Sequence, residues 1–129
     1  MIAVDTNIVI RLLTRDDASQ YKRALALFQT EDVFIADTVV LESEWVLRYA
    51  YDFSAEKICG ALLKLFGLKN VHLTSPQAMA QAIDQHRKGL DFADAIHLSK
   101  CQSCDTLYTF DKTFAAKAGN NANCPAVLA

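Results

Sequence analysis

The sequence predicts an α/β domain built on an open parallel sheet of five short strands, with helices on its faces. The main observation is an alternation along the chain, in which short apolar runs are separated by longer segments with helical periodicity. Strands that alternate with helices favour parallel pairing through right-handed crossovers. The length of 129 residues and the hydrophobic fraction of 52% fit one globular domain over residues 1–129.

The strands are expected where apolar runs stand between turn and helix signals. These runs lie at residues 2–4 (IAV), 33–36 (VFIA), 71–73 (VHL), 106–109 (TLYT) and 126–128 (AVL).

Capping residues delimit the expected helices. Asp17 opens "DASQ", Ser54 opens "SAEKICGALLKLFG" and Ser75 opens "SPQAMAQAIDQHRKG", so each segment begins with a side chain suited to an N-cap. Gly67 and Gly89 are expected to end the second and third of these helices. Further helices are expected in "VVLESEWVLRYA" (39–50), "DFADAIHLSKC" (91–101) and "KTFAAKAG" (112–119), the last ended by Gly119.

Charge and hydropathy restrict the function classes. The net charge of −2 and pI of about 5.8 exclude a global basic field for nucleic acid, although a local basic rim is still possible. The first apolar run is interrupted at Asp5 and Arg11, so no signal peptide is expected. No apolar stretch reaches the length of a membrane span. We therefore expect a cytoplasmic protein that does not bind membranes and whose four cysteines stay reduced.

Two carboxylates follow predicted strands directly. Asp5 comes after the first strand, and Asp111 comes after the fourth in "TLYTFD". Ligands of open α/β sheets bind beyond the carboxyl ends of the strands, at the point where the strand order reverses. If the two strands are neighbours there, both acids face one crevice. Alternatively, Asp5 is a turn residue and Asp111 caps the helix after it.

Helical segments supply further acids. Glu44 stands four residues before Arg48, which predicts a surface ion pair. Glu42 has no basic neighbour at helical spacing and shares a face with Trp45, so a cation is expected to compensate it.

The segment "GLDFADAIHL" carries two more acids, Asp91 and Asp94, on one helical face. Asp91 is also explained as an N-cap, whereas Asp94 lies deeper between two alanines. Acids from four separate segments favour a hard divalent cation, either Mg²⁺ or Mn²⁺, as one or two ions. Such ions bind a phosphodiester and stabilise the charge that develops during its hydrolysis.

Four motifs in order, "DTN", "LESEWVL", "DFADAIHL" and "TFDKTF", resemble the PIN-domain ribonucleases, and most of all the VapC-type toxins of toxin–antitoxin systems. The resemblance covers essentially the whole chain. It implies a PIN-like (Rossmann-like) fold, a Mg²⁺- or Mn²⁺-dependent ribonuclease, a homodimer, and a cognate antitoxin protein as partner.

The resemblance also implies site residues, position by position. Asp5, Glu42, Asp94 and Asp111 match the catalytic acids and metal ligands, and Asp91 matches a secondary acid. Thr6, Asn7 and Thr109 match supporting polar residues. Lys112 stands where many relatives have arginine, so it keeps the positive charge but loses the bidentate guanidinium.

RNA contacts are expected from basic residues near the site, because phosphate charge supplies most of the non-specific affinity. The candidates are Arg11, Arg15, Arg87, Lys88 and Lys112, and each is also explained as a solvated surface charge. Trp45 and the Phe and Tyr side chains are expected in the core rather than as base-stacking platforms.

Alternative interpretations use other residues. Cys101 and Cys104 have the spacing of half a zinc site, but a second half is missing, so buried free cysteines are expected. His97 either approaches the acids or packs beside them without a role. A non-catalytic PIN-like RNA- or protein-binding module is disfavoured by the complete acid set. A metal-dependent phosphatase of haloacid-dehalogenase type needs D-x-D after the first strand, where this chain has Asn7 at the third position.

Overall fold

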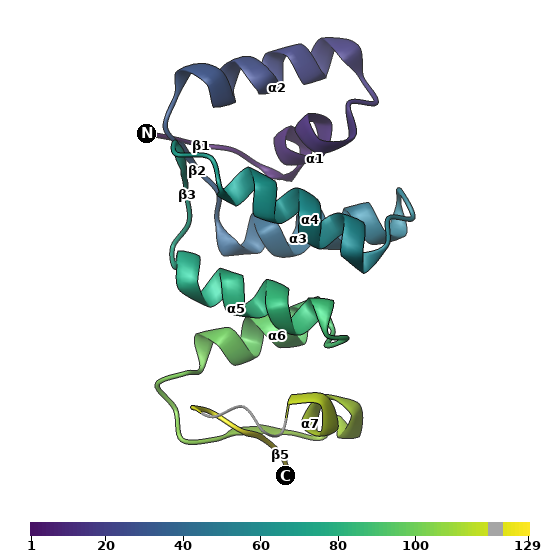
Figure 1. Cartoon of the computed structure of the whole chain (residues 1–129), viewed down its shortest axis with the longest axis vertical. Coiled ribbons are helices and arrows are strands. Elements are labelled where there is room, and N and C mark those ends of the chain that lie inside the picture. Colours follow the sequence, from purple (N-terminus) through teal and green to yellow (C-terminus); the bar gives the residue numbers. More distant parts are fainter. Residues whose placement is uncertain (119–122) are drawn as a thin grey trace. The chain divides into compact units, whose positions relative to one another are not determined.

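The computed structural model describes residues 1–118 and 123–129, which form two compact units. The N-terminal unit comprises Met1–Pro76 and the C-terminal unit Gln77–Ala129. Figure 1 shows both units.

The N-terminal unit contains a three-stranded parallel sheet in the order β1-β2-β3. Its strands are β1 (Ile2–Ala3), β2 (Val33–Phe34) and β3 (Val71–His72). Ile2 pairs with Val33, and Val33 pairs with Val71. All three strands are very short, so most of the unit's core comes from the helices that connect them.

Four helices complete the N-terminal unit: α1 (Thr6–Thr14), α2 (Ala18–Thr30), α3 (Asp37–Tyr49) and α4 (Ala55–Phe66). Asp17 caps α2 by accepting from the Gln20 amide at 2.9 Å, and Ser54 caps α4. Helix α1 packs against α2 and α3, and α3 packs against α4 (Figure 1). Val9, Ile10 and Leu47 are among the fully buried side chains of this unit.

The C-terminal unit contains α5 (Pro76–Arg87, whose first residue closes the N-terminal unit), α6 (Phe92–Lys100), β4 (Leu107–Thr109), α7 (Lys112–Ala118) and β5 (Ala126–Leu128). Strands β4 and β5 pair in parallel, with Leu107 opposite Ala126. Helix α7 packs on both strands. Met79, Ile83 and Phe92 are buried in this unit.

The predicted fold class is confirmed, since parallel strands alternate with helices at all five predicted strand positions. Among the described residues, however, the five strands pair as three and two rather than as one continuous ladder. Helix α1 was not predicted, because its polar start at Thr6 and Asn7 was interpreted as site residues alone.

Two of the predicted helix ends, at Gly67 and Gly89, are confirmed. Gly89 follows α5 with a φ of 110°, a conformation that glycine adopts without steric cost. Gly67 ends α4 as predicted and has right-handed helical angles, with a φ of −76°. Gly119, predicted to end α7, lies outside the described residues.

The prediction of buried aromatic side chains holds for Phe28, Phe92 and Phe114 but is wrong for others. Trp45 is 54% exposed, Tyr108 69% and Phe110 88%. Trp45 stacks on Tyr49 at 5.1 Å between ring centroids, on the outer face of α3. Within the described residues, no helix is both long enough and apolar enough to cross a bilayer.

Candidate functional site

Asp5 stands at the junction of β1 and α1, where it caps the helix. Its Oδ1 accepts a hydrogen bond from the Ile8 amide at 3.2 Å. An N-terminal carboxylate of this kind also interacts favourably with the helix dipole. The side chain is exposed, and the cap uses only one of its two oxygens. Both the structural and the ligand interpretation of Asp5 therefore fit its geometry.

Thr6 connects the β1–α1 junction to α3. Its buried side chain donates a hydrogen bond from Oγ1 to Oε1 of Glu42. Thr6 was expected among the supporting polar residues, and the acid that it contacts is Glu42. The exposed Glu42 carboxylate is thereby held in one orientation beside the residue that follows Asp5.

Glu44 forms the predicted pair with Arg48, but the pair does not lie on the surface. Arg48 donates from Nε at 2.8 Å and from Nη2 at 3.0 Å to the two carboxylate oxygens of Glu44. The Glu44 side chain is 1% exposed. A buried carboxylate needs such a bidentate partner, so Glu44 has a structural role that Glu42 does not share.

In the C-terminal unit, Asp91 caps α6 by accepting from the Asp94 amide at 3.3 Å. Burial raises the pKa of the half-buried Asp94 carboxyl, and the charges of Asp91 and Asp111 raise it further. His97 acts in the opposite direction. Three acids of this unit thus interact through their charges, with only partial compensation from a histidine.

Asp111 stands at the end of β4 and caps α7, since its Oδ1 accepts from the Phe114 amide at 3.1 Å. The Asp111 amide in turn donates to the Thr109 hydroxyl oxygen at 3.0 Å. This turn fixes the backbone of Asp111. As with Asp5, one carboxylate oxygen is used by the cap.

The predicted RNA-binding residues of the N-terminal unit have intramolecular partners. Arg11 donates to Gln20 at 2.7 Å, Tyr51 at 3.0 Å and Asp16 at 3.2 Å. The Arg15 guanidinium lies 4.9 Å from the centroid of the Tyr21 ring. Arg11 would have to give up these bonds to bind phosphate.

The remaining predicted RNA-binding residues belong to the C-terminal unit. Lys88 pairs with Asp84 at 3.0 Å on the surface of α5. Arg87 and Lys112 are exposed at the end of α5 and the start of α7. An exposed pair such as Lys88–Asp84 contributes little to stability. Arg87, Lys88 and Lys112 are therefore available to interact with other charges.

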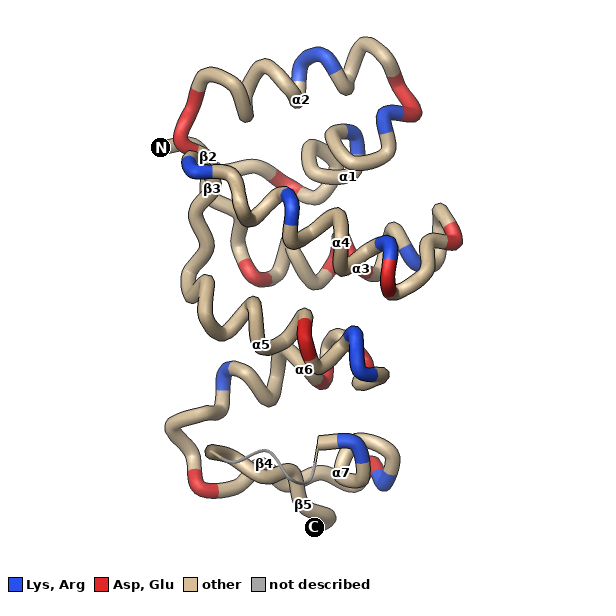
Figure 2. Tube along the Cα trace, viewed as in Figure 1, with Lys and Arg blue, Asp and Glu red and all other residues tan. Residues whose placement is uncertain are grey.

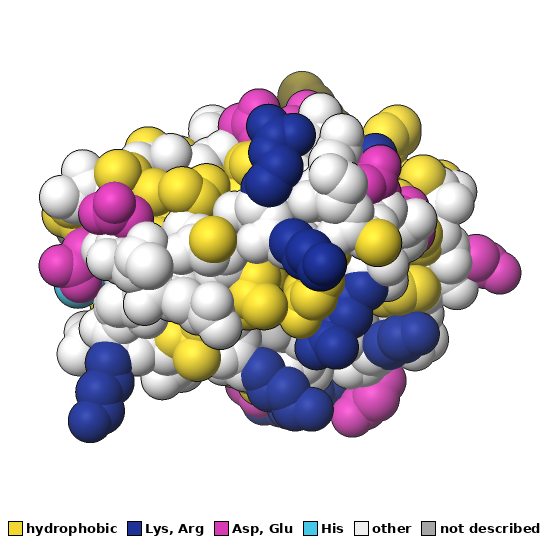
Figure 3. Space-filling model, turned by 90° about the horizontal axis from the view of Figure 1, so that it is seen from above, with side chains coloured by type: hydrophobic (Ala, Val, Ile, Leu, Met, Phe, Trp, Pro, Cys, Tyr) yellow, Lys and Arg dark blue, Asp and Glu magenta, His cyan; other side chains and the backbone are white. Residues whose placement is uncertain are grey.

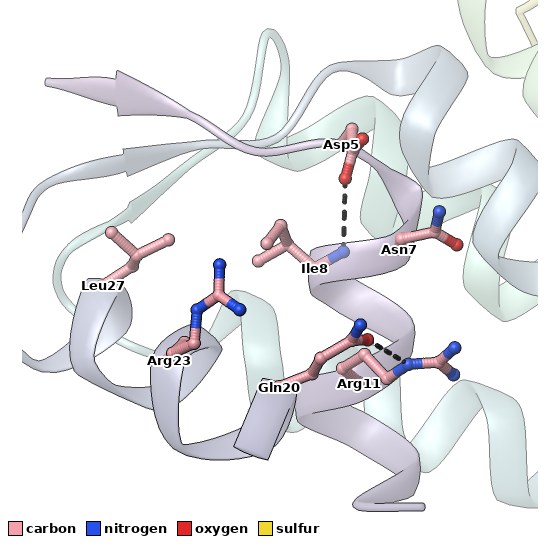
Figure 4. Close-up of a pocket in the computed structure, with 7 residues that line it drawn as sticks. All are labelled: Asp5, Asn7, Ile8, Arg11, Gln20, Arg23 and Leu27. Carbon is pink, nitrogen blue, oxygen red and sulfur yellow. Dashed lines mark hydrogen bonds between the residues drawn. The ribbon is translucent and has the colours of Figure 1, made fainter. Parts of the chain in front are cut away.

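A hollow of about 490 Å³ lies beside Asp5, between α1 and α2. It is lined by Asp5, Asn7, Ile8, Arg11, Gln20, Arg23 and Leu27. Figure 4 shows Asp5, Ile8, Arg23 and Leu27 around a common space. Arg23 and Gln20 were missed from the sequence, because their helical spacing is that of any exposed helix face.

A second hollow lies between α1, α2 and α4 and has a volume of about 630 Å³. Leu12, Leu25 and Leu65 contribute apolar walls, and Arg15 and Lys64 stand among its lining residues. The space-filling view from the α2 side shows Lys and Arg side chains around exposed hydrophobic ones (Figure 3). In Figure 2, the basic residues of the N-terminal unit are spread over its helices and interspersed with acids.

All four cysteines are free thiols, of which Cys59 and Cys124 are buried and Cys104 is exposed. Within neither unit do the described residues bring three or more His, Cys, Asp or Glu side chains into an arrangement that could hold a metal ion.

The sequence matches the family model of the PIN domain over residues 2–120, which is most of the chain. This protein belongs to the PIN domain family. The matched range begins in the N-terminal unit and extends through most of the C-terminal unit.

Two solved structures are similar to this chain. The toxin VapC20 of Mycobacterium tuberculosis, which cleaves the sarcin-ricin loop, is 21% identical, with a TM-score of 0.44 over 90% of this chain and 94% of that chain. VapBC2 from Rickettsia felis, solved with a DNA fragment from its promoter, is 18% identical, with a TM-score of 0.37 over 99% of this chain and 98% of that chain. No curated protein matches the sequence.

The four acids that the PIN resemblance implies are divided equally between the units. Asp5 and Glu42 belong to the N-terminal unit and are linked through Thr6. Asp94 and Asp111 belong to the C-terminal unit and interact through their charges. The two acids of each unit thus interact with each other, or through a shared neighbour, within that unit.

Proposed function

We propose that this PIN protein is an endoribonuclease that hydrolyses RNA phosphodiester bonds with the help of Mg²⁺ or Mn²⁺. The observation that carries the proposal is the PIN family match over residues 2–120, which includes the group of neighbouring acids Asp91, Asp94 and Asp111. Neighbouring carboxylates that repel one another disfavour their own ionised state. A divalent cation compensates such a group, and its binding would offset this cost.

The donor chemistry fits one or two hard cations. Asp5, Glu42, Asp94 and Asp111 would hold the metal, with Asp91 as a further ligand. Carboxylate oxygens are the ligands that Mg²⁺ and Mn²⁺ prefer. The caps at Asp5 and Asp111 use Oδ1 of each side chain, so Oδ2 is available for a ligand. When bound, the cation supplies positive charge to the phosphodiester and favours attack by water.

The chain's own residues orient these acids. Thr6 holds Glu42 by donating to Oε1, and Thr109 holds the backbone of Asp111. Helix caps fix Asp5, Asp91 and Asp111 at ordered backbone positions. Rigid ligands bind a cation without a further loss of side-chain freedom. We expect hydrolysis to leave 5′-phosphate and 3′-hydroxyl ends.

We further propose that the protein is the toxin of a VapBC-type pair and acts in the cytoplasm as a homodimer. The hollow between α1, α2 and α4 supports an antitoxin partner, since its apolar walls suit a helix or strand of another chain. Arg15, Lys57 and Lys64 also line this hollow and favour an acidic partner by charge. Co-purification with the product of the adjacent gene would test the pair, and light scattering would test the dimer.

The nuclease proposal is tested by RNA cleavage with the full chain in Mg²⁺, in Mn²⁺ and in EDTA. We expect cleavage only with metal, and a loss of at least a hundredfold in Asp5→Asn. The matched control is Asp17→Asn, because Asp17 caps α2 as Asp5 caps α1. The control removes the same negative charge from a helix N-cap, where asparagine still accepts the amide hydrogen bond, and should keep its activity.

Cleavage that survives both EDTA and Asp5→Asn would contradict the metal-dependent mechanism. RNA binding without cleavage under any metal would instead favour the non-catalytic binding module. Equal losses in Asp5→Asn and Asp17→Asn would show that the negative charge of Asp5 acts only on the helix N-terminus and not on a metal.

A further inference from the structure

We propose that the hollow between α1 and α2 is the binding site for an unstacked guanine base of the RNA, and that Arg23 reads this base. The proposal rests on the nuclease function above, because it concerns a nucleotide next to the bond that is cleaved. The hollow adjoins Asp5, one of the candidate metal ligands, and all of its lining residues belong to the N-terminal unit.

The size and walls of the hollow suit a flat base. Its volume of about 490 Å³ lies within the usual range of ligand pockets, roughly 300–1,000 Å³. Ile8 and Leu27 supply apolar surface on two sides of the space (Figure 4). Sequence-specific RNA recognition uses unstacked bases that enter such sites and form hydrogen bonds through their edges.

Arg23 is the available cation of the hollow. Its side chain is exposed, and the described residues provide it with no hydrogen bond or ion pair. Arg11, the other arginine of the hollow, is held by Gln20, Asp16 and Tyr51. Figure 4 shows the guanidinium of Arg23 between Leu27 and Ile8, whereas that of Arg11 lies away from them. The selective contact is therefore assigned to Arg23.

The polar groups of the hollow favour guanine. Oε1 of Gln20 accepts from Nε of Arg11, which leaves the Gln20 amide nitrogen to donate. Arg23 likewise has only donors, in a fork that matches two neighbouring acceptors. Guanine presents two such acceptors, O6 and N7, whereas adenine places an amino group at the position of O6.

The site is tested with the full chain in EDTA, without any RNA cleavage. Each of the four 5′-mononucleotides (GMP, AMP, CMP and UMP) is titrated into isotopically labelled protein and followed by NMR. We expect GMP to shift the Ile8 and Leu27 methyl signals and the Gln20 side-chain amide signals. GMP should bind at least fivefold more tightly than AMP. Because all four probes carry the same phosphate, the comparison isolates the base.

Three variants of the hollow and one control variant separate base recognition from simple charge. Arg23→Gln should weaken GMP binding at least fivefold, and Arg23→Lys should lose the preference for GMP over AMP because lysine has no fork. Lys22→Gln is the matched control, since Lys22 is the exposed neighbour of Arg23 and does not line the hollow. The control should bind GMP as the unmodified chain does. Leu27→Asn removes an apolar wall of the hollow and leaves Arg23 in place. This variant should also weaken GMP binding.

Equal binding of the four nucleotides, shifts confined to other parts of the chain, or unchanged affinity in Arg23→Gln would overturn the proposal. Cleavage mapping on a randomised RNA distinguishes its failure from that of the nuclease function. Cleavage without any guanine preference would contradict the base site alone. GMP binding in the hollow without metal-dependent cleavage would support a guanine site and contradict the nuclease.

Discussion

The hydroxyl of Thr6 donates a hydrogen bond to the carboxylate of Glu42, although the two residues are 36 positions apart. Thr6 is the first residue of α1, and Glu42 lies in the middle of α3. One bond thus joins the end of β1, where Asp5 stands, to a second candidate metal ligand. It also explains how an exposed glutamate keeps a defined orientation.

Thr6→Val should therefore reduce metal-dependent RNA cleavage about tenfold and lower the free energy of unfolding by about 1 kcal/mol. Valine keeps the shape of threonine but cannot orient Glu42. Thr6→Ser is the matched variant, because it retains the hydroxyl and should retain most of the activity. Cleavage rates and urea unfolding measure the two effects. Equal activity in the two variants would contradict an orienting role for the hydroxyl.

Asp94→Asn should stabilise the metal-free protein at neutral pH. The folded-state pKa of Asp94 is raised by burial and by Asp91 and Asp111, so ionisation at neutral pH costs folding free energy. Asparagine removes that cost. Thermal unfolding in EDTA should show a higher Tm for this variant, with Asp84→Asn on the surface of α5 as the control.

The same variant should lose the stabilisation by metal. At a metal concentration of about 100 times Kd, a ligand that binds only the folded state adds about 2.7 kcal/mol. The unmodified chain should show a gain of that order with Mn²⁺, whereas Asp94→Asn should show little. A full metal response in Asp94→Asn would exclude Asp94 as a ligand.

Asp16 should make the folding stability of the protein depend on pH in the acidic range, through its contacts at the corner between α1 and α2. The Tyr51 hydroxyl lowers the pKa of the Asp16 carboxyl, and the Thr14 hydroxyl and the Arg11 charge act in the same direction against partial desolvation. A lowered folded-state pKa contributes stability above the unfolded value of about 3.9, and this contribution disappears as the pH falls through the folded value.

The chain should thus be more stable than Asp16→Asn at pH 7, and the difference should shrink below about pH 4. Urea unfolding at several pH values measures this difference. A constant difference from pH 7 to pH 3 would show that Asp16 acts through packing or neutral hydrogen bonds instead.

Arg48→Met should destabilise the chain by about 2–4 kcal/mol, because it leaves the buried Glu44 carboxylate without its bidentate partner. The double variant Glu44→Leu, Arg48→Met removes both charges and should recover much of the loss. Chemical unfolding of the single and double variants gives the coupling energy. A double variant that is less stable than Arg48→Met would contradict this account.

The features that depend on near neighbours were predictable from the sequence. Asp17, Ser54 and Asp91 accept from amides three residues later, so the capping signals could be recognised in short segments. The apolar runs placed all five strands. The order of four motifs indicated the PIN family, which the family match confirms.

Features that depend on distant residues were decided by the tertiary structure. Trp45 lies exposed on α3 while Glu44 beside it is buried, because the packing of α3 turns one face outward and the other inward. The hydrogen bond from Arg11 to Tyr51 and the hydrogen bond from Thr6 to Glu42 each join positions more than 30 residues apart.

The sequence by itself thus determined the alternation of elements, most helix starts and the set of candidate acids, because these follow from side-chain chemistry and spacing within a few residues. Only the tertiary structure decided which side chain each acid contacts and which arginine beside Asp5 is available to a ligand. The physical reason is that hydrogen bonds and burial depend on which surfaces meet when the helices pack, and segments distant in the sequence supply those surfaces.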